Sequence, residues 1–390
     1  MTSLLDSLPG KALAVLALCL MVATAVGLVV LWPDGGREAR LPNSLRPAPE
    51  QAEVLAVAVQ PCQNPGARRC RRVDARLLSG PDRGTRTVFR TGEAGFDPDV
   101  EAGDRLRLVK NETPIRGTDG SIEPYSLADF ERRSTIRWLL LGFVALVVAF
   151  GRWRGALAVV GLGISLAVVI QFVLPALLEG RPPLAVAMIG SLAIMFVTIA
   201  LAHGVGPKSL AAALGTAASL LLTAGLAVVF TELAHLTGFS SEEATLLQAN
   251  AGAVSLQGLV LAGMVIGALG VLDDVTVSQA SAVMALRRAN PAQRFGQLYR
   301  GGLSVGRDHV AATVNTLVLA YVGASLPILL IFAVGETPFG DAVNREAVAE
   351  QIVATLVGSI GLIAAVPVTT ALAALLAAPP PRSDKSRSSI

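Results

Sequence analysis

Charged residues, aromatic residues, cysteines and histidines are all scarce in this sequence. Only 16% of its 390 residues are Asp, Glu, Lys or Arg, and 53% are hydrophobic, whereas soluble domains contain about a quarter charged residues. This shortage of charge excludes an ordinary soluble protein and indicates an integral membrane protein. Aromatic residues make up 5% of the chain, and those in the polar region 33–135 are too few to form a stacking platform for nucleic acid.

Several motifs of common catalytic sites are also missing. The three histidines, His203, His235 and His309, lie far apart and do not form the H-E-x-x-H spacing of zinc hydrolases. The sequence contains neither a P-loop nor a dinucleotide-binding fingerprint. We therefore expect a protein that is not an enzyme and that uses no metal and no cofactor.

The chain has only three cysteines. Cys19 lies in the first apolar segment, while Cys62 and Cys70 lie close together in a polar stretch. Two interpretations of that pair stay open: two unrelated thiols, or a short disulfide loop if the stretch faces the outside of the cell.

Long apolar segments dominate the rest of the sequence. A helix needs about 20 apolar residues to cross a membrane, and eight segments approach or exceed that length. The chain is therefore predicted to be a multi-pass α-helical membrane protein with about eight transmembrane helices. Ala23-Thr24-Ala25 imitates a signal-peptidase site, but the apolar run continues past it, which favours an uncleaved anchor. The eight segments are 11–32, 136–151, 155–178, 183–203, 207–232, 254–286, 309–334 and 350–378.

The basic residues of the short loops predict the orientation. Arg152, Arg154, Lys208 and several arginines between residues 287 and 307 fall on one side, and that side should be cytoplasmic by the positive-inside rule. Both termini then lie in the cytoplasm, and the protein is expected in the bacterial cytoplasmic membrane.

A polar region of about a hundred residues separates the first two apolar segments. Its second part alternates short β-branched runs with Gly/Pro/Asp clusters, which predicts a small extracytoplasmic antiparallel β domain, a sheet or an OB-like barrel. The expected organisation is an N-terminal anchor (1–32), a linker (33–51), the β domain (52–120), a seven-helix membrane bundle (130–378) and a cytoplasmic tail (379–390).

Two adjacent acids interrupt the sixth apolar segment, in "GALGVLDDVTVSQASAVMALRR". A helix over residues 258–286 would be about 43 Å long, and Asp273 and Asp274 would lie near its middle. Ionised carboxylates at that depth are costly and repel each other, so at least one should carry a proton near neutral pH. In the alternative interpretation the helix ends at Leu272, and the acids lie at the cytoplasmic interface.

Other polar residues recur at helical spacing around the acids and in the next apolar segment, "GRDHVAATVNT". Polar residues on a membrane helix must face protein or water, so we expect the two groups to face each other. The predicted proton or ion relay consists of Asp273, Asp274, Asp308, Arg307 and His309. The predicted polar path consists of Thr276, Ser278, Gln279, Thr313, Asn315 and Thr316.

Three resemblances follow from these motifs and from the layout of the chain. The run Gly270–Val277, "GVLDDVTV", resembles the fourth-helix signature of the resistance–nodulation–division exporters, and the layout of the chain is similar to that of the protein-export subunit SecF. The resemblance implies that Asp273 and Asp274 relay protons, although this chain has a smaller external domain and no second half. Over residues 11–378, "LDDVTVSQ" and "GRDHVAATVNTLVLAY" identify the chain as a member of the YibE/F-like family of bacterial membrane proteins.

The sequence thus predicts a proton-coupled transporter or export-assisting permease that uses the paired aspartates. The alternative is a non-transporting membrane scaffold or assembly protein that presents the β domain. Expected partners are the lipid bilayer and an unknown small molecule or ion, together with a second copy of the chain or another membrane protein; no nucleic acid is expected.

Overall fold

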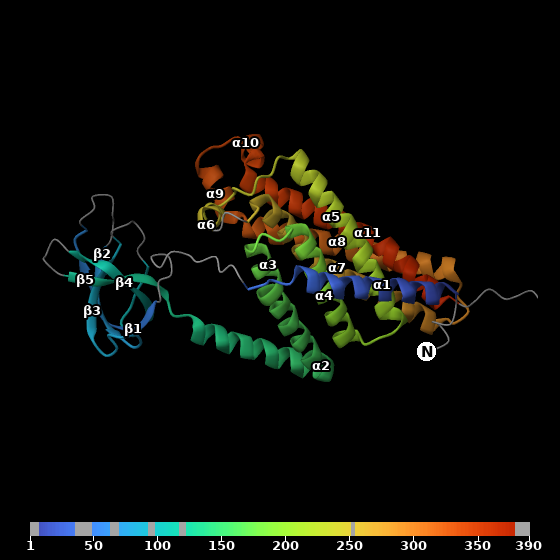
Figure 1. Ribbon diagram of the computed structural model, residues 1–390, viewed down its shortest axis with the longest axis horizontal. Helices are drawn as coiled ribbons and strands as arrows, with labels where there is room; N and C mark the ends of the chain where they lie inside the picture. The colour runs from blue at the N-terminus through green and yellow to red at the C-terminus, as the bar shows by residue number, and fades with distance from the viewer. Residues whose placement is uncertain are drawn as a thin grey trace, which may run out of the picture. The chain divides into compact units, whose positions relative to one another are not determined.

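The computed structural model describes residues 8–35, 49–62, 70–92, 98–116, 122–250 and 254–378 (Figure 1). Most of the linker expected at 33–51 and the whole tail expected at 379–390 lie outside these residues. The chain divides into two compact units, one of Met1–Ala39 with Val147–Ile390, and one of Arg40–Leu146. The mainly helical chain with a small sheet after the first helix confirms the predicted fold class in its broad outline.

Apolar helices make up the first unit. Six described helical elements are long and apolar enough to cross a membrane, or seven if the bent pair α8–α9 forms one span. The prediction of eight transmembrane helices is not confirmed, because the expected spans at 136–151 and 155–178 belong to one helical element. The spanning elements are α1 (Leu8–Leu31), α2–α3 (Arg133–Leu178), α4 (Pro183–His203), α5 (Pro207–Leu233), α7 (Leu256–Ala289), α8 (Phe295–Ala324) with α9 (Leu326–Val334), and α11 (Glu346–Ala377).

The long element is not a straight helix. Arg152 has φ 51° and ψ −132°, which breaks α2 (Arg133–Val168) at the point where the sequence predicted a loop. A Cβ at Gly155 would overlap the Val147 carbonyl group, so the chain on the two sides of the break is in close contact and only glycine fits there.

Two prolines coincide with distortions of these helices. A π-helical turn, η3 (Val169–Val173), joins α2 to α3 (Leu174–Leu178), which contains Pro175. Pro327 lies in the first turn of α9, where the α8–α9 pair bends by 60°. A proline lacks the N–H of the helical ladder and its ring clashes with the preceding turn. Pro367, by contrast, lies within a continuous α11.

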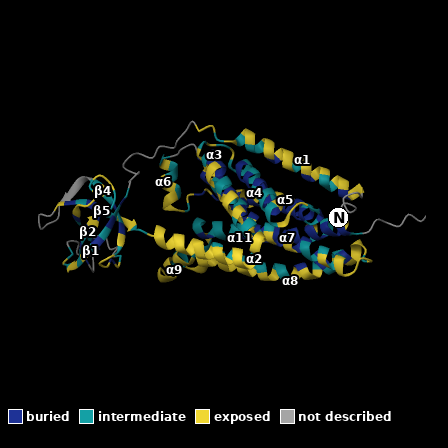
Figure 2. Cartoon of the chain, turned by 90° about the horizontal axis from the view of Figure 1, so that it is seen from below, coloured by how far each residue is buried: buried dark blue, intermediate teal, exposed yellow. Residues whose placement is uncertain are grey.

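The core of this unit is formed by α5, α7 and α11, which contain most of its buried residues (Figure 2). Small residues set the distance between α5 and α11. A Cβ at Gly215 would overlap the Thr369 hydroxyl, and a Cβ at Gly361 would overlap the Thr223 hydroxyl. Each helix therefore presents one glycine to a threonine of the other, which lets the backbones approach closely.

Five antiparallel strands form the second unit, and β3 also contacts β5. The apolar side chains that alternate along the strands, among them Val54, Val73, Phe89 and Leu106, form the core of this unit. Cys62 and Cys70 form a disulfide at the start of β2. The sheet has the order β3-β2-β1-β4-β5, with β1 (Glu50–Gln60), β2 (Cys70–Leu77), β3 (Arg86–Thr91), β4 (Arg105–Arg116) and β5 (Ile122–Phe130), so its last strand lies past the expected end at residue 120.

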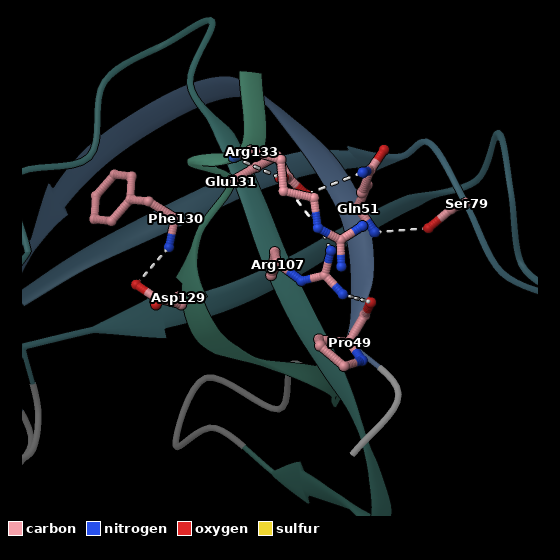
Figure 3. Close-up of polar contacts among 8 residues, drawn as sticks. All are labelled: Pro49, Gln51, Ser79, Arg107, Asp129, Phe130, Glu131 and Arg133. Carbon is pink, nitrogen blue, oxygen red and sulfur yellow. Dashed lines mark hydrogen bonds and ion pairs between the residues drawn. The ribbon is translucent and has the colours of Figure 1, made fainter. Parts of the chain in front are cut away.

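A buried carboxylate closes this unit where β5 leads into α2 (Figure 3). Glu131 Oε2 accepts hydrogen bonds from Arg107 Nη1 at 3.0 Å and from Gln51 Nε2 at 2.9 Å, and the Arg133 N–H donates to Oε1. Burial alone would raise the pKa of Glu131, but the hydrogen bonds from Arg107, Arg133 and Gln51 outweigh it and lower that pKa. The ionised carboxylate thus joins the first strand, β4 and the start of α2.

A second polar cluster surrounds Tyr125. Its hydroxyl donates to Asp82 Oδ2 at 2.6 Å, and Lys110 Nζ donates to the same oxygen, also at 2.6 Å. These bonds, from Lys110 first and from Tyr125 second, lower the pKa of Asp82. Burial, together with the acceptor Asp82, raises the pKa of Tyr125. The cluster is therefore most stable with Asp82 ionised and Tyr125 neutral.

Candidate functional site

Helix α7 runs unbroken through the paired aspartates. It begins after Ser255, whose hydroxyl accepts the Gly258 N–H, and it continues to Ala289 without ending at Leu272. The residues after the aspartates keep the helix packed, since Val275, Ala280 and Val283 are fully buried. Asp273 and Asp274 therefore lie near the middle of a 34-residue helix that is long enough to cross a membrane.

Asp273 faces α4 and is partly buried. The Thr198 hydroxyl of α4 lies 3.3 Å from Asp273 Oδ2, and the same hydroxyl also reaches the Ile194 and Met195 carbonyl oxygens of its own helix. Asp273 Oδ1 is buried and has no hydrogen-bond partner. No Lys, Arg or His among the described residues forms an ion pair with Asp273. The carboxyl group thus has one buried oxygen, one weak donor and no counter-charge.

Asp274, one residue further along α7, is exposed. Both aspartates line a hollow of about 520 Å³ on the outer face of α7, together with His203, Ser278 and Ser281. His203 ends α4, and its Nδ1 lies 3.3 Å from Lys208 Nζ at the start of α5. The hollow therefore contains two acids, one titratable base and two hydroxyl groups, which are the groups that can bind and exchange a proton.

Two residues of the predicted polar path point away from this hollow. The hydroxyls of Thr276 and Thr216 share a 2.6 Å hydrogen bond between α7 and α5. Gln279 Nε2 donates to the Gly302 carbonyl of α8 at 2.6 Å and to the Thr370 hydroxyl of α11 at 2.7 Å. Both side chains are buried, and they hold four helices together. Ser278 is the one residue of the predicted path on α7 that faces the hollow.

The polar residues of α8 do not contact the aspartates in the described structure. Arg307, Asp308, Asn315 and Thr316 are exposed, and Thr316 donates to the Ala312 carbonyl of its own helix. His309 and Thr313 are partly buried; Thr313 donates to the His309 carbonyl, and His309 Nε2 is buried without a hydrogen-bond partner. The structure thus gathers the predicted relay residues on two separate helix faces.

Sequence analysis missed three residues that the fold brings to the aspartates, namely Thr198, His203 and Ser281. Ser281 follows Ser278 by three residues and Asp274 by seven, so helical spacing on α7 was a sufficient signal for it. Thr198 and His203 are on another helix, and only the packing of α4 against α7 places them at the site. In the sequence, Thr198 and His203 stand out only as polar residues in the last part of the apolar segment 183–203.

Two further features bear on chemistry. Residues 302–306, "GLSVG", match the G-x-S-x-G pattern of serine hydrolases, but they lie inside the continuous helix α8, where Ser304 is exposed. That motif needs a strained turn between a strand and a helix, so the match indicates helix packing. Within the described residues, no three His, Cys, Asp or Glu side chains are grouped so as to hold a metal ion.

Comparison with known proteins identifies the chain. Residues 139–379 match the model of the family described as YibE/F-like protein, and this match spans more than half of the chain, including the aspartate pair and the polar face of α8. No curated protein matches the chain, and neither does any solved structure. With its apolar spanning helices, the chain is an integral membrane protein that belongs to the YibE/F-like family.

Proposed function

We propose that the protein is a proton-coupled transporter or export-assisting permease in which Asp273 binds the coupling proton. The observation that carries this proposal is the environment of Asp273, in the middle of an unbroken spanning helix and with one buried, unpaired carboxylate oxygen. A carboxylate at that depth without a cation is stabilised by taking up a proton. A carboxyl group at this depth lowers the stability of the membrane helix. Exchange of its proton gives a functional reason to keep it.

Asp274 and His203 supply the exchange route in this proposal. Asp274 is exposed and adjacent to Asp273, and His203 lies on the rim of the same hollow at the end of α4. A neutral imidazole accepts a proton and a protonated one donates it, so His203 can pass protons between the acids and water. We place this end of the bundle in the cytoplasm, because Lys208, Arg287 and Arg288 lie there.

A second hollow supports access from the opposite end. It has a volume of about 320 Å³ and lies near the start of α7, where Gly263, Tyr321 and Glu350 are among its lining residues. The Tyr321 hydroxyl, which belongs to this second hollow, lies 3.5 Å from the position that a Cβ at Gly267 would occupy, and Gly270, three residues further along α7, lines the hollow of the aspartates. In the proposed mechanism this contact separates the two access routes, and its opening connects them.

The rest of the architecture fits this scheme. The strand order with β3 beside β5 supports an OB-like barrel, which we place outside the cell. The break at Arg152 supports two separate crossings by α2–α3, which would bring the number of spans to eight with both termini inside. We propose no enzymatic activity for the chain.

Protonation of Asp273 can be tested without knowledge of the substrate. Infrared difference spectra of the protein in proteoliposomes, recorded across a pH step, should contain a band of a protonated carboxyl group. The band should be lost in Asp273→Asn and kept in Asp341→Asn, which removes an exposed acid of α10 (Phe339–Asn344) far from the hollow. Proton uptake by the same proteoliposomes should fall in Asp273→Asn. Equal bands and equal uptake in the wild type and Asp273→Asn would refute the proposal.

One observation favours the alternative, a membrane scaffold that presents the β domain. Thr276 and Gln279, both predicted to line a path, instead form hydrogen bonds between helices. A scaffold would use Asp273 in the same way, with Thr198 as its partner. It predicts that Asp273→Asn lowers the folded yield and changes no proton signal per folded molecule.

A further inference from the structure

Helix α8 carries a regular polar seam on a face that nothing in the described structure covers. Its members are exposed and recur at alternating intervals of four and three residues, which is the heptad spacing of helices that pack side by side. Small and polar side chains occupy its first two thirds, and valines occupy the last third. The seam consists of Ser304, Asp308, Ala311, Asn315, Val318 and Val322.

The opposite face of α8 already provides its contacts with the bundle. Gly302 and Gly306 are buried against Gln279 of α7 and against Val366 and Thr370 of α11. Further along, Leu317 contacts Gly358 of α11. The seam is therefore not required for packing within one copy of the chain.

Contacts between α7 and α8 give the depth of the seam in the membrane. Gln279 pairs with Gly302, and Gly267 lies beside Tyr321, so the helices run antiparallel. Interpolation between the two pairs places Asn315 within about one helical turn of the level of Asp273. An amide at that depth is unfavourable against lipid and must face protein or water.

We propose that the seam binds the same seam of a second copy, so that two α8 helices form the centre of a two-fold dimer. When two copies are inserted in the membrane in the same direction, their α8 helices run parallel. A residue on the two-fold axis of the dimer then contacts the same residue of the second copy. An asparagine suits such a position, because its side chain is both donor and acceptor and can pair with itself. Polar pairs of this kind hold membrane helices together.

Charge and size along the seam are also self-complementary. Arg307 and Asp308 are both exposed, and neither forms an ion pair among the described residues. In a parallel pair, Asp308 meets Asp308 of the second copy, and Arg307 of each copy flanks the seam, where it can reach Asp308 of the other copy and offset the repulsion of the two acids. Ser304 and Ala311 are small, which allows the two backbones to approach. This proposal does not depend on whether Asp273 binds protons.

Cysteine cross-linking of the full-length protein in membranes tests the arrangement. In a Cys19→Ser background, which removes the free thiol, Ala311→Cys should form a disulfide-linked dimer under mild oxidation. Thr316→Cys is the control, because it is exposed within two helical turns of Ala311, about 7.5 Å along the axis, but lies about 100° or more around the helix from the seam. Equal cross-linking at both positions, or none at either, would overturn the proposal. So would labelling of Ala311→Cys by a water-soluble maleimide without cross-linking, because the seam would then line a water-filled space.

A second measurement addresses the asparagine. Single-molecule photobleaching in lipid bilayers gives the monomer–dimer equilibrium, and Asn315→Leu should weaken the dimer by about threefold to thirtyfold. Asn315→Gln keeps a donor and an acceptor and should retain most of the affinity, while an unchanged thermal unfolding midpoint shows that the monomer is intact. A dimer equally strong in Asn315→Leu, or a wild type that stays monomeric, refutes the seam.

Discussion

Replacement of Gln279 by methionine tests whether this side chain stabilises the helix bundle or takes part in proton transfer. Methionine has nearly the same volume, so the change removes the hydrogen bonds and leaves little cavity. In the wild type, Gln279 Nε2 donates to the Gly302 carbonyl and to the Thr370 hydroxyl, both in the buried centre of the bundle. Thr370 keeps its bond to the Val366 carbonyl, so the loss is confined to two interhelical bonds.

The size of the effect follows from those two bonds. Hydrogen bonds between membrane helices contribute about 0.6 kcal/mol on average and up to about 1.7 kcal/mol each. Gln279→Met should therefore lower the free energy of unfolding by about 1 to 3 kcal/mol. The same substitution at Gln257, which is exposed at the start of α7, should change it by less than about 0.5 kcal/mol.

Reversible unfolding in mixed micelles, titrated with a denaturing detergent, measures this difference. The proton uptake and the infrared carboxyl band per folded molecule should be unchanged in Gln279→Met, because the side chain faces away from the hollow. Equal stability of Gln279→Met and Gln257→Met would refute the structural role that we assign. A loss of proton uptake at unchanged stability would restore Gln279 to the polar path.

Two further predictions concern packing and pH. Gly215→Val should lower the free energy of unfolding of the bundle by about 1 to 3 kcal/mol, because its Cβ would overlap the Thr369 hydroxyl. Gly225 lies in open space on the same helix, so Gly225→Val should lower the free energy of unfolding clearly less. The same detergent titration measures both variants. In the β domain, Asp82 has a lowered pKa, so its contribution to stability is present above about pH 4 and is lost as the pH falls through the folded-state pKa. Pepsin cleavage within residues 50–130 of the full-length protein should accelerate below about pH 4, and Asp82→Asn should weaken that pH dependence; an identical pH profile in the variant would contradict the assignment.

Much of the fold could be predicted from the lengths of the apolar segments and from short sequence motifs. Apolar length predicted the spanning helices, and the sequence motifs predicted the family. The count of spans was harder, because the link at Arg152 is one non-helical residue in place of a loop. The arginines at 152 and 154 marked the place of the break, but its single-residue form depends on the contact between Gly155 and Val147, which composition does not reveal.

Some predicted polar residues of α7 line the hollow and others pack inside the bundle, and helical periodicity alone could not predict which do which. Thr276 and Ser278 flank Val277 and are similar in chemistry, yet Thr276 bonds to α5 and Ser278 lines the hollow. A two-residue step on a helix is a rotation of about 200°, so two neighbouring polar residues lie on opposite faces. Which face is internal depends on the neighbours of α7, and these come from distant parts of the chain.

The rule that polar residues in a membrane must face protein or water applies to both polar faces, and the structure gives a different result for each. On α7 it led to the expectation that the aspartates face polar groups, and the fold supplies Thr198 and His203. On α8 the same rule suggested α7 as the partner of Asp308 and Asn315, whereas the structure leaves these two residues exposed. Within the described part of the chain, no helix covers that face. A second copy provides one with matching spacing, and the cross-linking of Ala311→Cys against Thr316→Cys decides whether it does.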